Sequence, residues 1–243
     1  MIRIVLAAAA IFLAMVGAGQ ACETVSHRDR SFTVCMADLA SQRVSVRLSD
    51  DQGAVLGSFV ALERDVQAPI AFAMNGGMYH PDRAPVGLYV EDGATVSPLV
   101  TKAGPGNFGM LPNGVFCVAP SRARVIESRA FATDPPVCTH ATQSGPMLVI
   151  AGALHPRFIA DSPYLNIRNG VGATPDGQTV FFVISDEPVS FHEMATLFRD
   201  NLGVRDALYL DGRVSRLYAP ALGRNDGGRR MGPILLVTET VDG

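Results

Sequence analysis

The chain has 243 residues, of which 48% are hydrophobic and 18% charged, a composition typical of a globular protein and unlike a disordered or fibrous one. It carries 24 Gly and 16 Pro residues, so turns are expected to be frequent. The net charge of −3 provides no electrostatic footprint for a nucleic acid or an anionic membrane surface.

The first 21 residues have the pattern of a secretory signal peptide. Arg3 supplies the positive start, residues 4–19 are apolar or small, and the small-x-small sequence at 19–21 is a cleavage site. The apolar run is too short for a membrane anchor, and no stop-transfer segment follows it. We therefore expect an exported protein, periplasmic or extracellular, without stable membrane insertion.

The mature chain, residues 22–243, is expected to form one domain. It contains 19 basic and 23 acidic residues, because Arg3 leaves with the leader, so its net charge is −4. Lipid anchoring at Cys22 is the alternative to simple export. It is disfavoured because Gly19 stands where lipoprotein signals favour leucine.

Hydrophobic periodicity predicts many strands and about two helices. In chain order the predicted elements are a strand pair within 23–50, a short helix at 55–66, a strand at 69–74, a hairpin at 85–96, a strand pair at 115–120 and 123–129, a strand within 144–152, a strand pair within 165–187, a helix at 189–203, and strands at 206–212 and 233–240. Segments 102–114 and 131–143 are expected to be irregular. This order indicates an α+β fold with mixed or antiparallel sheets and a few short helices.

The helix at 189–203 has the clearest local signals. Ser190 is a plausible N-cap, Glu193 occupies the capping-box position, and Gly203 marks the C-terminal end. The four cysteines of the mature chain, in an exported protein, predict two disulfides. Their spacing favours the local pairs Cys22–Cys35 and Cys117–Cys138.

Polar residues, mostly flanked by glycine, lie at the ends of several predicted strands. They are Asn75-Gly76-Gly77, Ser144-Gly145-Pro146, Arg168-Asn169-Gly170, Ser185-Asp186-Glu187 and Asp211-Gly212-Arg213. Each also has an ordinary structural interpretation. Asn75 and Asp211 can belong to hairpin turns, Arg168 can pair with a surface carboxylate, and Asp186 can complement the dipole of the following helix. No nucleophile elbow, phosphate-binding loop or zinc-ligand spacing is present in the sequence.

Six segments in this order resemble the phosphodiester glycosidase domain family, which includes the lysosomal uncovering enzyme. They are MNGGMYHPDRAPVGLYVEDG, GNFGMLPNGVF, ATQSGPMLV, RNGVGATPDGQTVFFVIS, VSFHEMATLF and DALYLDGRVSRLY, and together they span about residues 30–237. The chain is most similar to a bacterial branch of exported proteins without an assigned substrate. The resemblance implies hydrolysis of a sugar-1-phosphodiester at the anomeric carbon.

The family motifs fall on Asn75-Gly76-Gly77, Arg168 and Leu210-Asp211-Gly212. For the activity that the resemblance implies, we expect Asp211 to be the nucleophile or general base and Arg168 to hold the phosphodiester. Asn75 would bind the sugar or phosphate, and Asp186 or Glu187 would be the second carboxylate. The residues expected to contact substrate are Gly76, Gly77, Tyr79, Ser144, Gly145, Glu187, His192, Gly212 and Arg213.

Two further expectations concern the surroundings of Asp211. Many family members continue Asp-Gly with glycine and small hydroxyl residues, whereas this chain has Arg213-Val214-Ser215-Arg216. The pocket is therefore expected to be bulkier and more basic, with Arg213 or Arg216 able to recognise an extra phosphate or carboxylate. Asn75, Asp186 and Asp211 would make an oxygen-rich set for Ca²⁺ or Mg²⁺, although their spacing does not require a metal.

Three functions fit these observations. The first is an exported phosphodiester glycosidase acting on an envelope glycan. The second is a non-catalytic carbohydrate- or phosphate-binding envelope protein on the same scaffold. The third is a phosphodiesterase that cleaves the P–O bond. In each case the expected partner is a carbohydrate or glycosyl phosphate, and the oligomeric state is open.

Overall fold

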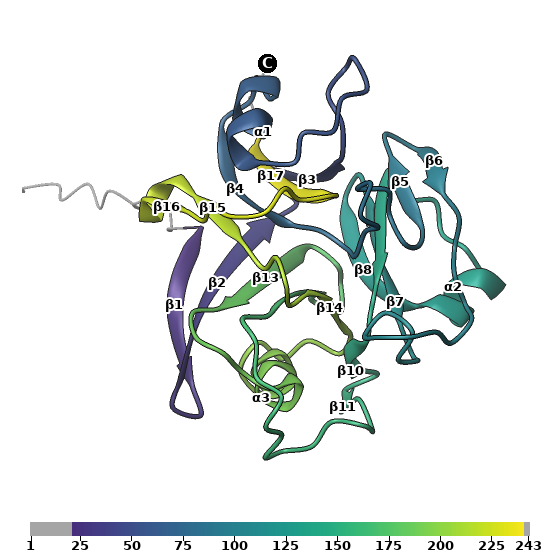
Figure 1. Cartoon of the computed structure of the whole chain (residues 1–243), viewed down its shortest axis with the longest axis vertical. Coiled ribbons are helices and arrows are strands. Elements are labelled where there is room, and N and C mark those ends of the chain that lie inside the picture. The colour runs from purple at the N-terminus through teal and green to yellow at the C-terminus, as the bar shows by residue number, and fades with distance from the viewer. Residues whose placement is uncertain (1–20, 241–243) are drawn as a thin grey trace, which may run out of the picture.

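A computed structural model of the chain describes residues 21–240, which form three antiparallel sheets around a shared core (Figure 1). The predicted signal peptide lies, except for its last residue, outside the described residues. Sheet 1 has the strand order β1 (Cys22–His27), β2 (Arg30–Asp38), β13 (Thr179–Ser185), β12 (Asn169–Ala173), β14 (Ala207–Asp211), β10 (Met147–Ile150) and β11 (Ala153–Leu154).

The other two sheets have five strands each. Sheet 2 has the order β16 (Arg224–Asn225), β15 (Leu217–Ala219), β4 (Ile70–Asn75), β17 (Ile234–Glu239) and β3 (Gln42–Arg47). Sheet 3 has the order β6 (Ala94–Ser97), β5 (Tyr89–Glu91), β9 (His140–Ser144), β7 (Gly114–Ala119) and β8 (Arg122–Glu127). The α+β class predicted from the sequence is confirmed.

The inner faces of the three sheets meet at a cluster of phenylalanines. Phe182 of sheet 1 makes edge-to-face contacts with Phe72 of sheet 2 and Phe116 of sheet 3, at centroid distances of 5.1 and 6.1 Å. All three rings are fully buried. Burying side chains of this size removes a large apolar area from water, which is the main force that holds the sheets together.

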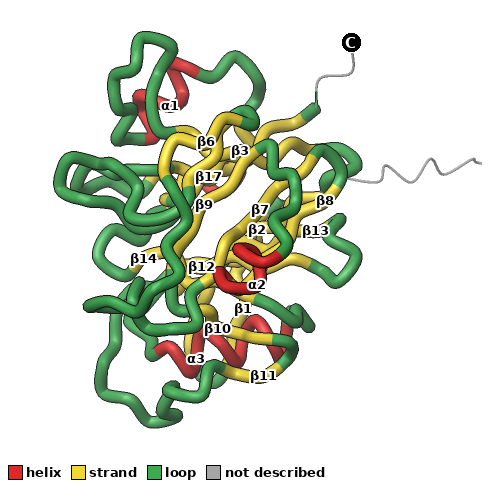
Figure 2. Tube along the Cα trace, turned by 90° about the vertical axis from the view of Figure 1, so that its right-hand side faces the viewer, coloured by secondary structure: helices red, strands yellow, loops and turns green. Residues whose placement is uncertain are grey.

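Each sheet carries one short helix on its outer side, at the periphery of the molecule (Figure 2). The helices are α1 (Phe59–Asp65) over sheet 2, α2 (Ser128–Thr133) over sheet 3, and α3 (Phe191–Thr196) over sheet 1. A π-helical turn, Leu197–Asn201, continues α3, and a 3₁₀ turn, Pro220–Leu222, follows β15. The predicted capping box of α3 is present, with Ser190 and Glu193 bonding to each other's backbone N–H groups. None of the helices within residues 21–240 is both long enough and apolar enough to cross a membrane.

The two local disulfides, Cys22–Cys35 and Cys117–Cys138, are formed as predicted. Two other expectations are wrong. The strands predicted as an N-terminal pair do not pair with each other, because β2 lies between β1 and β13 while β3 pairs with β17. The segment 131–143 is not wholly irregular, since it contains the end of α2 and most of β9. In both cases long-range pairing decided the outcome.

Candidate active site

Three polar strand ends meet where sheets 1 and 2 adjoin. Asp211 at the end of β14 stands opposite Asn169 at the start of β12, because the two strands are antiparallel. Asn75 ends β4 in sheet 2, and its side chain reaches across to Asn169. Asn75 does not begin a hairpin, because the partners of β4 are β15 and β17. The order of strands in the two sheets thus brings the ends of β14 and β4 and the start of β12 to one point.

Asn75 and Asn169 form a buried, reciprocal amide pair. The Asn169 Nδ2 donates to Asn75 Oδ1 at 3.0 Å, and Asn75 Nδ2 donates to Asn169 Oδ1 at 3.3 Å. The Asn75 Oδ1 also accepts the backbone N–H of Arg216 at 2.8 Å. Asn75 is only 1% exposed. Its expected contact with sugar or phosphate is therefore corrected: Asn75 positions the site from beneath.

The Asp211 carboxylate is held by the loop that follows it. Its Oδ1 accepts the N–H groups of Gly212 and Arg213 at 2.5 and 2.6 Å, and its own N–H donates to Asn169 Oδ1 at 3.0 Å. Burial raises the pKa of Asp211 above its ordinary value, and the bonds from the loop amides lower it only in part. A half-buried carboxylate with a raised pKa at a strand end is suited to acid–base or nucleophilic chemistry.

Arg168 is a buried cation without a carboxylate partner. It is 2% exposed, its Nε donates to the Val189 carbonyl at 2.8 Å, and its Nη2 donates to the Tyr164 carbonyl at 2.9 Å. No ion pair joins it to any acidic residue within residues 21–240, and its Nη1 has no hydrogen-bond partner there. Burial lowers its pKa, but a guanidinium remains charged at neutral pH. The alternative interpretation of Arg168, a salt bridge with a surface carboxylate, does not hold within residues 21–240, and this favours an anionic ligand.

Tyr209 lies between Arg168 and Asp211. The Arg168 Cζ is 5.5 Å from the Tyr209 ring centroid, and both charged groups act on the Tyr209 hydroxyl, whose pKa is raised mainly by burial. A Cβ added to Gly212 would overlap this hydroxyl, so the glycine of the Leu-Asp-Gly motif makes room for it. Phe191 completes the stack, with its ring 3.7 Å from the Arg168 Cζ.

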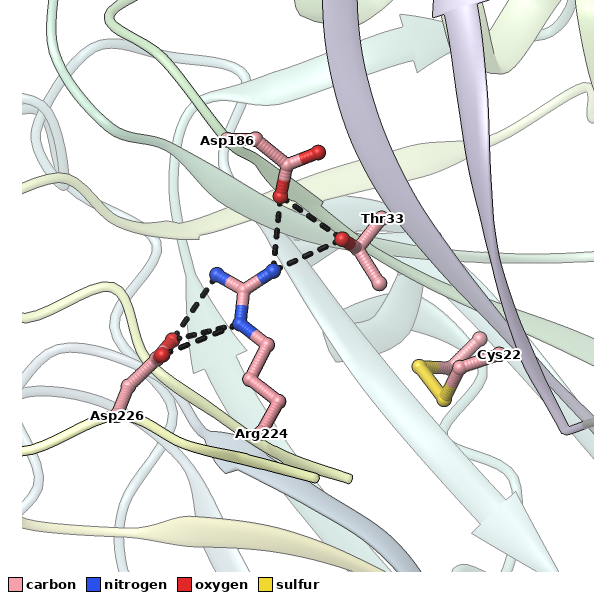
Figure 3. Close-up of a disulfide and its surroundings, with 6 residues drawn as sticks. Cys22, Thr33, Asp186, Arg224 and Asp226 are labelled. Carbon is pink, nitrogen blue, oxygen red and sulfur yellow. Dashed lines mark hydrogen bonds and ion pairs between the residues drawn. A yellow bond between two sulfur atoms is a disulfide. The ribbon is translucent and has the colours of Figure 1, made fainter. Parts of the chain in front are cut away.

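Asp186, expected as the second carboxylate, is bound by residues of β2 and β16 and not by Asp211, Arg168 or Tyr209. Asp186 Oδ1 forms an ion pair with Arg224 Nη1 at 2.8 Å and accepts the Thr33 hydroxyl at 2.8 Å (Figure 3). Asp186 Oδ2 accepts the Ser31 hydroxyl. Both oxygens of the Asp186 carboxylate are therefore bound by side chains of β2 and β16. In the oxygen-rich set considered for Ca²⁺ or Mg²⁺, the Asp186 carboxylate is held by Arg224 and the Asn75 amide by Asn169. Within residues 21–240, no three His, Cys, Asp or Glu side chains are grouped so that they could hold a metal ion.

Several of the residues expected to contact substrate have other tasks. The Gly76 N–H donates to the Pro233 carbonyl at 2.7 Å and the Gly77 N–H to the Thr142 hydroxyl at 3.2 Å, so neither amide is free to bind a ligand. The buried Ser144 hydroxyl donates to the Leu210 carbonyl at 2.9 Å. The bonds to Thr142 and from Ser144 connect the segment after β4, and β14, to β9 of sheet 3, so these groups serve the fold.

The remaining candidates are divided between the site and its periphery. Burial raises the pKa of Tyr79, and the charge of the nearby Asp211 raises it further. The Tyr79 hydroxyl donates to the Arg230 carbonyl at 3.1 Å. Gly145 packs its backbone against Asn113 and the carbonyl of Asn107, in the loop beside Tyr209. Arg213 is exposed in the loop after Asp211.

Glu187 and His192 lie away from this group. Glu187 forms an ion pair with Arg30 at 3.1 Å, and its expected contact with substrate stays a prediction. His192 is half-buried in the first turn of α3, and no hydrogen bond or ion pair within residues 21–240 links it to Asp211 or Arg168. The structure therefore gathers Asp211, Arg168 and Asn75, but not Glu187 or His192.

Sequence reasoning missed two members of the site. Tyr209 stands two residues before Asp211 on the same strand, so strand alternation places both on one face and was an available signal. Asn169 adjoins Arg168, but nothing local shows that its amide binds Asn75, 94 residues away. We define the candidate active site as Asp211, Arg168 and Tyr209, supported by Asn75 and Asn169.

The fold and site define an α+β protein with a carboxylate and a buried cation at converging strand ends. The phosphodiester glycosidase family model matches residues 68–238. The chain belongs to the phosphodiester glycosidase family, which is a family of glycosidase-type hydrolases.

Known proteins agree with this membership. Over 180 residues the chain is 37% identical to the uncharacterised protein YigE of Escherichia coli, covering 73% of this chain and 70% of that one. The fold is similar to the catalytic domain of zebrafish N-acetylglucosamine-1-phosphodiester alpha-N-acetylglucosaminidase auto-inhibited by its pro-peptide, with a TM-score of 0.58, 14% identity, and coverage of 90% of this chain and 82% of that one.

A hypothetical protein from Synechocystis is also similar in fold, with a TM-score of 0.57 and 14% identity. The match covers 90% of this chain but only 61% of the cyanobacterial protein, so this chain spans less than two thirds of that relative. At 14% identity both structural matches show the fold alone.

Proposed function

We propose that this protein is an exported hydrolase that cleaves a glycosyl-1-phosphodiester at the anomeric carbon, on an envelope glycan. The observation that carries the proposal is that a half-buried carboxylate, Asp211, and a buried guanidinium, Arg168, both act on Tyr209, while Arg168 has no acidic partner within residues 21–240. A buried charge without a partner costs free energy, so we infer that an anionic group of the substrate binds the Arg168 guanidinium.

The chemistry needs only one carboxylate at the reacting carbon. Asp211 acts as nucleophile at the anomeric carbon, or as the base that takes a proton from the attacking water. The C–O bond breaks with its electron pair on the phosphate oxygen. Glycosidases ordinarily use a second carboxyl group to protonate the leaving oxygen. A phosphate monoester leaves as an anion without that proton, so the diversion of Asp186 to Arg224 does not prevent the reaction.

Arg168 and Tyr209 stabilise the departing phosphate in this proposal. Negative charge develops on the leaving group, and a fixed cation in a site of low dielectric stabilises it more than water does. Tyr209 presents its hydroxyl beside both Arg168 and Asp211, and its raised pKa keeps it a donor at neutral pH. The two disulfides and the sequence of the leader support export.

The test is release of free sugar from a defined diester. Purified protein is incubated with the methyl phosphodiester of α-N-acetylglucosamine-1-phosphate and with the corresponding diesters of other sugars. Asp211→Asn is expected to lower kcat by about a thousandfold or more while preserving the fold. Asp134→Asn, at an exposed position after α2, is the matched control and should keep full activity. Equal activity in Asp211→Asn would remove Asp211 from its role.

The alternatives give different results in the same experiment. Hydrolysis in ¹⁸O-labelled water places the label in the sugar for glycosidase chemistry and in the phosphate for P–O cleavage. A non-catalytic binding protein would show saturable binding of the diesters without any release of sugar. Label in the phosphate, or binding without turnover across the panel, would each overturn the proposal.

A further inference from the structure

An open pocket of about 630 Å³ lies beside the candidate active site, reached across the loop 212–216. Its walls come from the ends of β12 and β13, from this loop, and from the segment 224–229 around β16. The charged side chains that line it are Asp186, Arg213, Arg216, Arg224, Asp226 and Arg229. Figure 3 shows one wall of the pocket, where Arg224 lies between Asp186 and Asp226.

Both acidic residues of the pocket are bound by one arginine, and four arginines face these two aspartates, so the lining has a net charge of 4 − 2 = +2. Arg224 binds Asp186 at 2.8 Å through Nη1, and it binds Asp226 at 3.0 Å through Nη2. The other three arginines, Arg213, Arg216 and Arg229, have no ion pair with an acidic residue in the part of the chain that the structure describes. The pocket therefore carries an excess of positive charge within a protein whose net charge is negative.

Arg216 is the residue that makes this pocket more than a basic surface. It is only 7% exposed, yet its guanidinium makes no hydrogen bond to any group of residues 21–240. Its backbone is fixed by the bond from its N–H to Asn75, and its Nη2 lies against Gly228, where a Cβ would come within 2.7 Å. Burial lowers the pKa of Arg216, but the group remains a cation. Its donors face the open pocket and have no hydrogen-bond partner within residues 21–240, so they are available to an anion that enters it.

We propose that this pocket binds a phosphate group, with Arg216 as its principal ligand and Arg213 and Arg229 at its rim. A guanidinium offers paired N–H donors that match the oxygens of phosphate, and such charge-assisted bonds are stronger than neutral ones. Gly227 and Gly228 leave the approach to Arg216 free of side chains. The site is separate from Arg168, whose guanidinium is buried against Phe191 under α3. The proposal concerns binding alone and does not rest on the proposed hydrolysis.

Two sources can supply this phosphate, and two probes distinguish them. Inorganic phosphate represents a free dianion, and poly(glycerol phosphate) represents a polymer of diester monoanions. Binding of each to the mature protein is measured by calorimetry at constant ionic strength set with chloride. The probe that binds more tightly identifies the source. Because a lost charge-assisted bond weakens binding strongly, Arg216→Gln is expected to reduce the affinity at least about tenfold.

Three further variants make the result decisive. Arg122→Gln, an exposed arginine of β8, is the matched control and should bind as the wild type does. Arg229→Gln tests the pocket without altering a buried side chain, and it should weaken binding severalfold even if Arg216→Gln fails to fold. Phosphate bound at Arg168 instead of in the pocket would give weaker binding in Arg168→Gln and unchanged binding in Arg216→Gln and Arg229→Gln. The proposal is overturned if neither probe binds, if Arg216→Gln and Arg229→Gln bind normally, or if binding is lost only in Arg168→Gln.

Discussion

The buried amide pair beneath the candidate active site leads to a quantitative prediction. Asn169→Ala removes an acceptor from the Asp211 N–H, which donates to it at 3.0 Å, and from Asn75 Nδ2, which donates to it at 3.3 Å. The Ser215 hydroxyl keeps other acceptors, the carbonyls of Ile167 and Asp211. Two buried donors are thus left without a good partner.

Each of these orphaned donors costs about 1–3 kcal/mol, so Asn169→Ala is expected to lower the free energy of unfolding by about 3 kcal/mol. Asn75→Ala should have a similar effect, because it removes the acceptor of the Arg216 N–H. The double variant no longer contains the orphaned Asn75 amide. It should therefore lose about 2 kcal/mol less than the sum of the two single variants.

Equilibrium urea unfolding with the disulfides intact measures these changes from the midpoints and slopes. Asn225→Ala, at an exposed position of β16, is the control and should change the unfolding free energy by less than about 0.5 kcal/mol. The folded Asn169→Ala protein should also have a lower kcat, because Asp211 loses the bond that fixes its backbone. A cost below about 1 kcal/mol, or strict additivity in the cycle, would refute the amide pair as the support of the site.

Three other predictions concern the same region and the second disulfide. Burial raises the pKa of Asp211, so the folded state binds that proton more tightly than the unfolded state, and stability falls as the pH rises above the unfolded pKa of about 3.9. Asp211→Asn should therefore unfold at a higher urea concentration than the wild type at pH 7, with the difference closing toward pH 3; a difference independent of pH would contradict this. Gly212→Ala should destabilise the protein, because its Cβ overlaps the Tyr209 hydroxyl, and adding Tyr209→Phe should restore part of the loss; no rescue would place the strain elsewhere. Replacing Cys117 and Cys138 together by serine removes a crosslink between residues 21 positions apart, which should lower the free energy of unfolding in urea by about 3 kcal/mol. An unchanged midpoint would show that strand pairing alone closes this loop.

Much of the local structure could be predicted because its causes lie within a few residues. The capping box of Ser190 and Glu193 starts α3, and a turn at Asp92-Gly93 joins β5 to β6. The disulfides also follow short-range closure, with Cys22 standing directly opposite Cys35 in the β1–β2 pair. The family motifs identified Asp211 and Arg168, two of the three residues that the candidate active site brings together.

The tertiary structure alone decided which strands become neighbours and which polar side chains remain available. Asn75 has the sequence of a turn residue, but its amide is consumed by Asn169 and by the backbone of Arg216. Asp186 resembles a catalytic carboxylate in sequence, but it forms an ion pair with Arg224 and accepts a hydrogen bond from Thr33, both on distant strands. The pairing of strands depends on which of their faces become buried in the folded protein. Whether a polar side chain has a hydrogen-bond partner depends on residues that lie far from it in the sequence. The sequence by itself determined the chemistry present at each strand end, and the packing of three sheets determined which of those ends could act together.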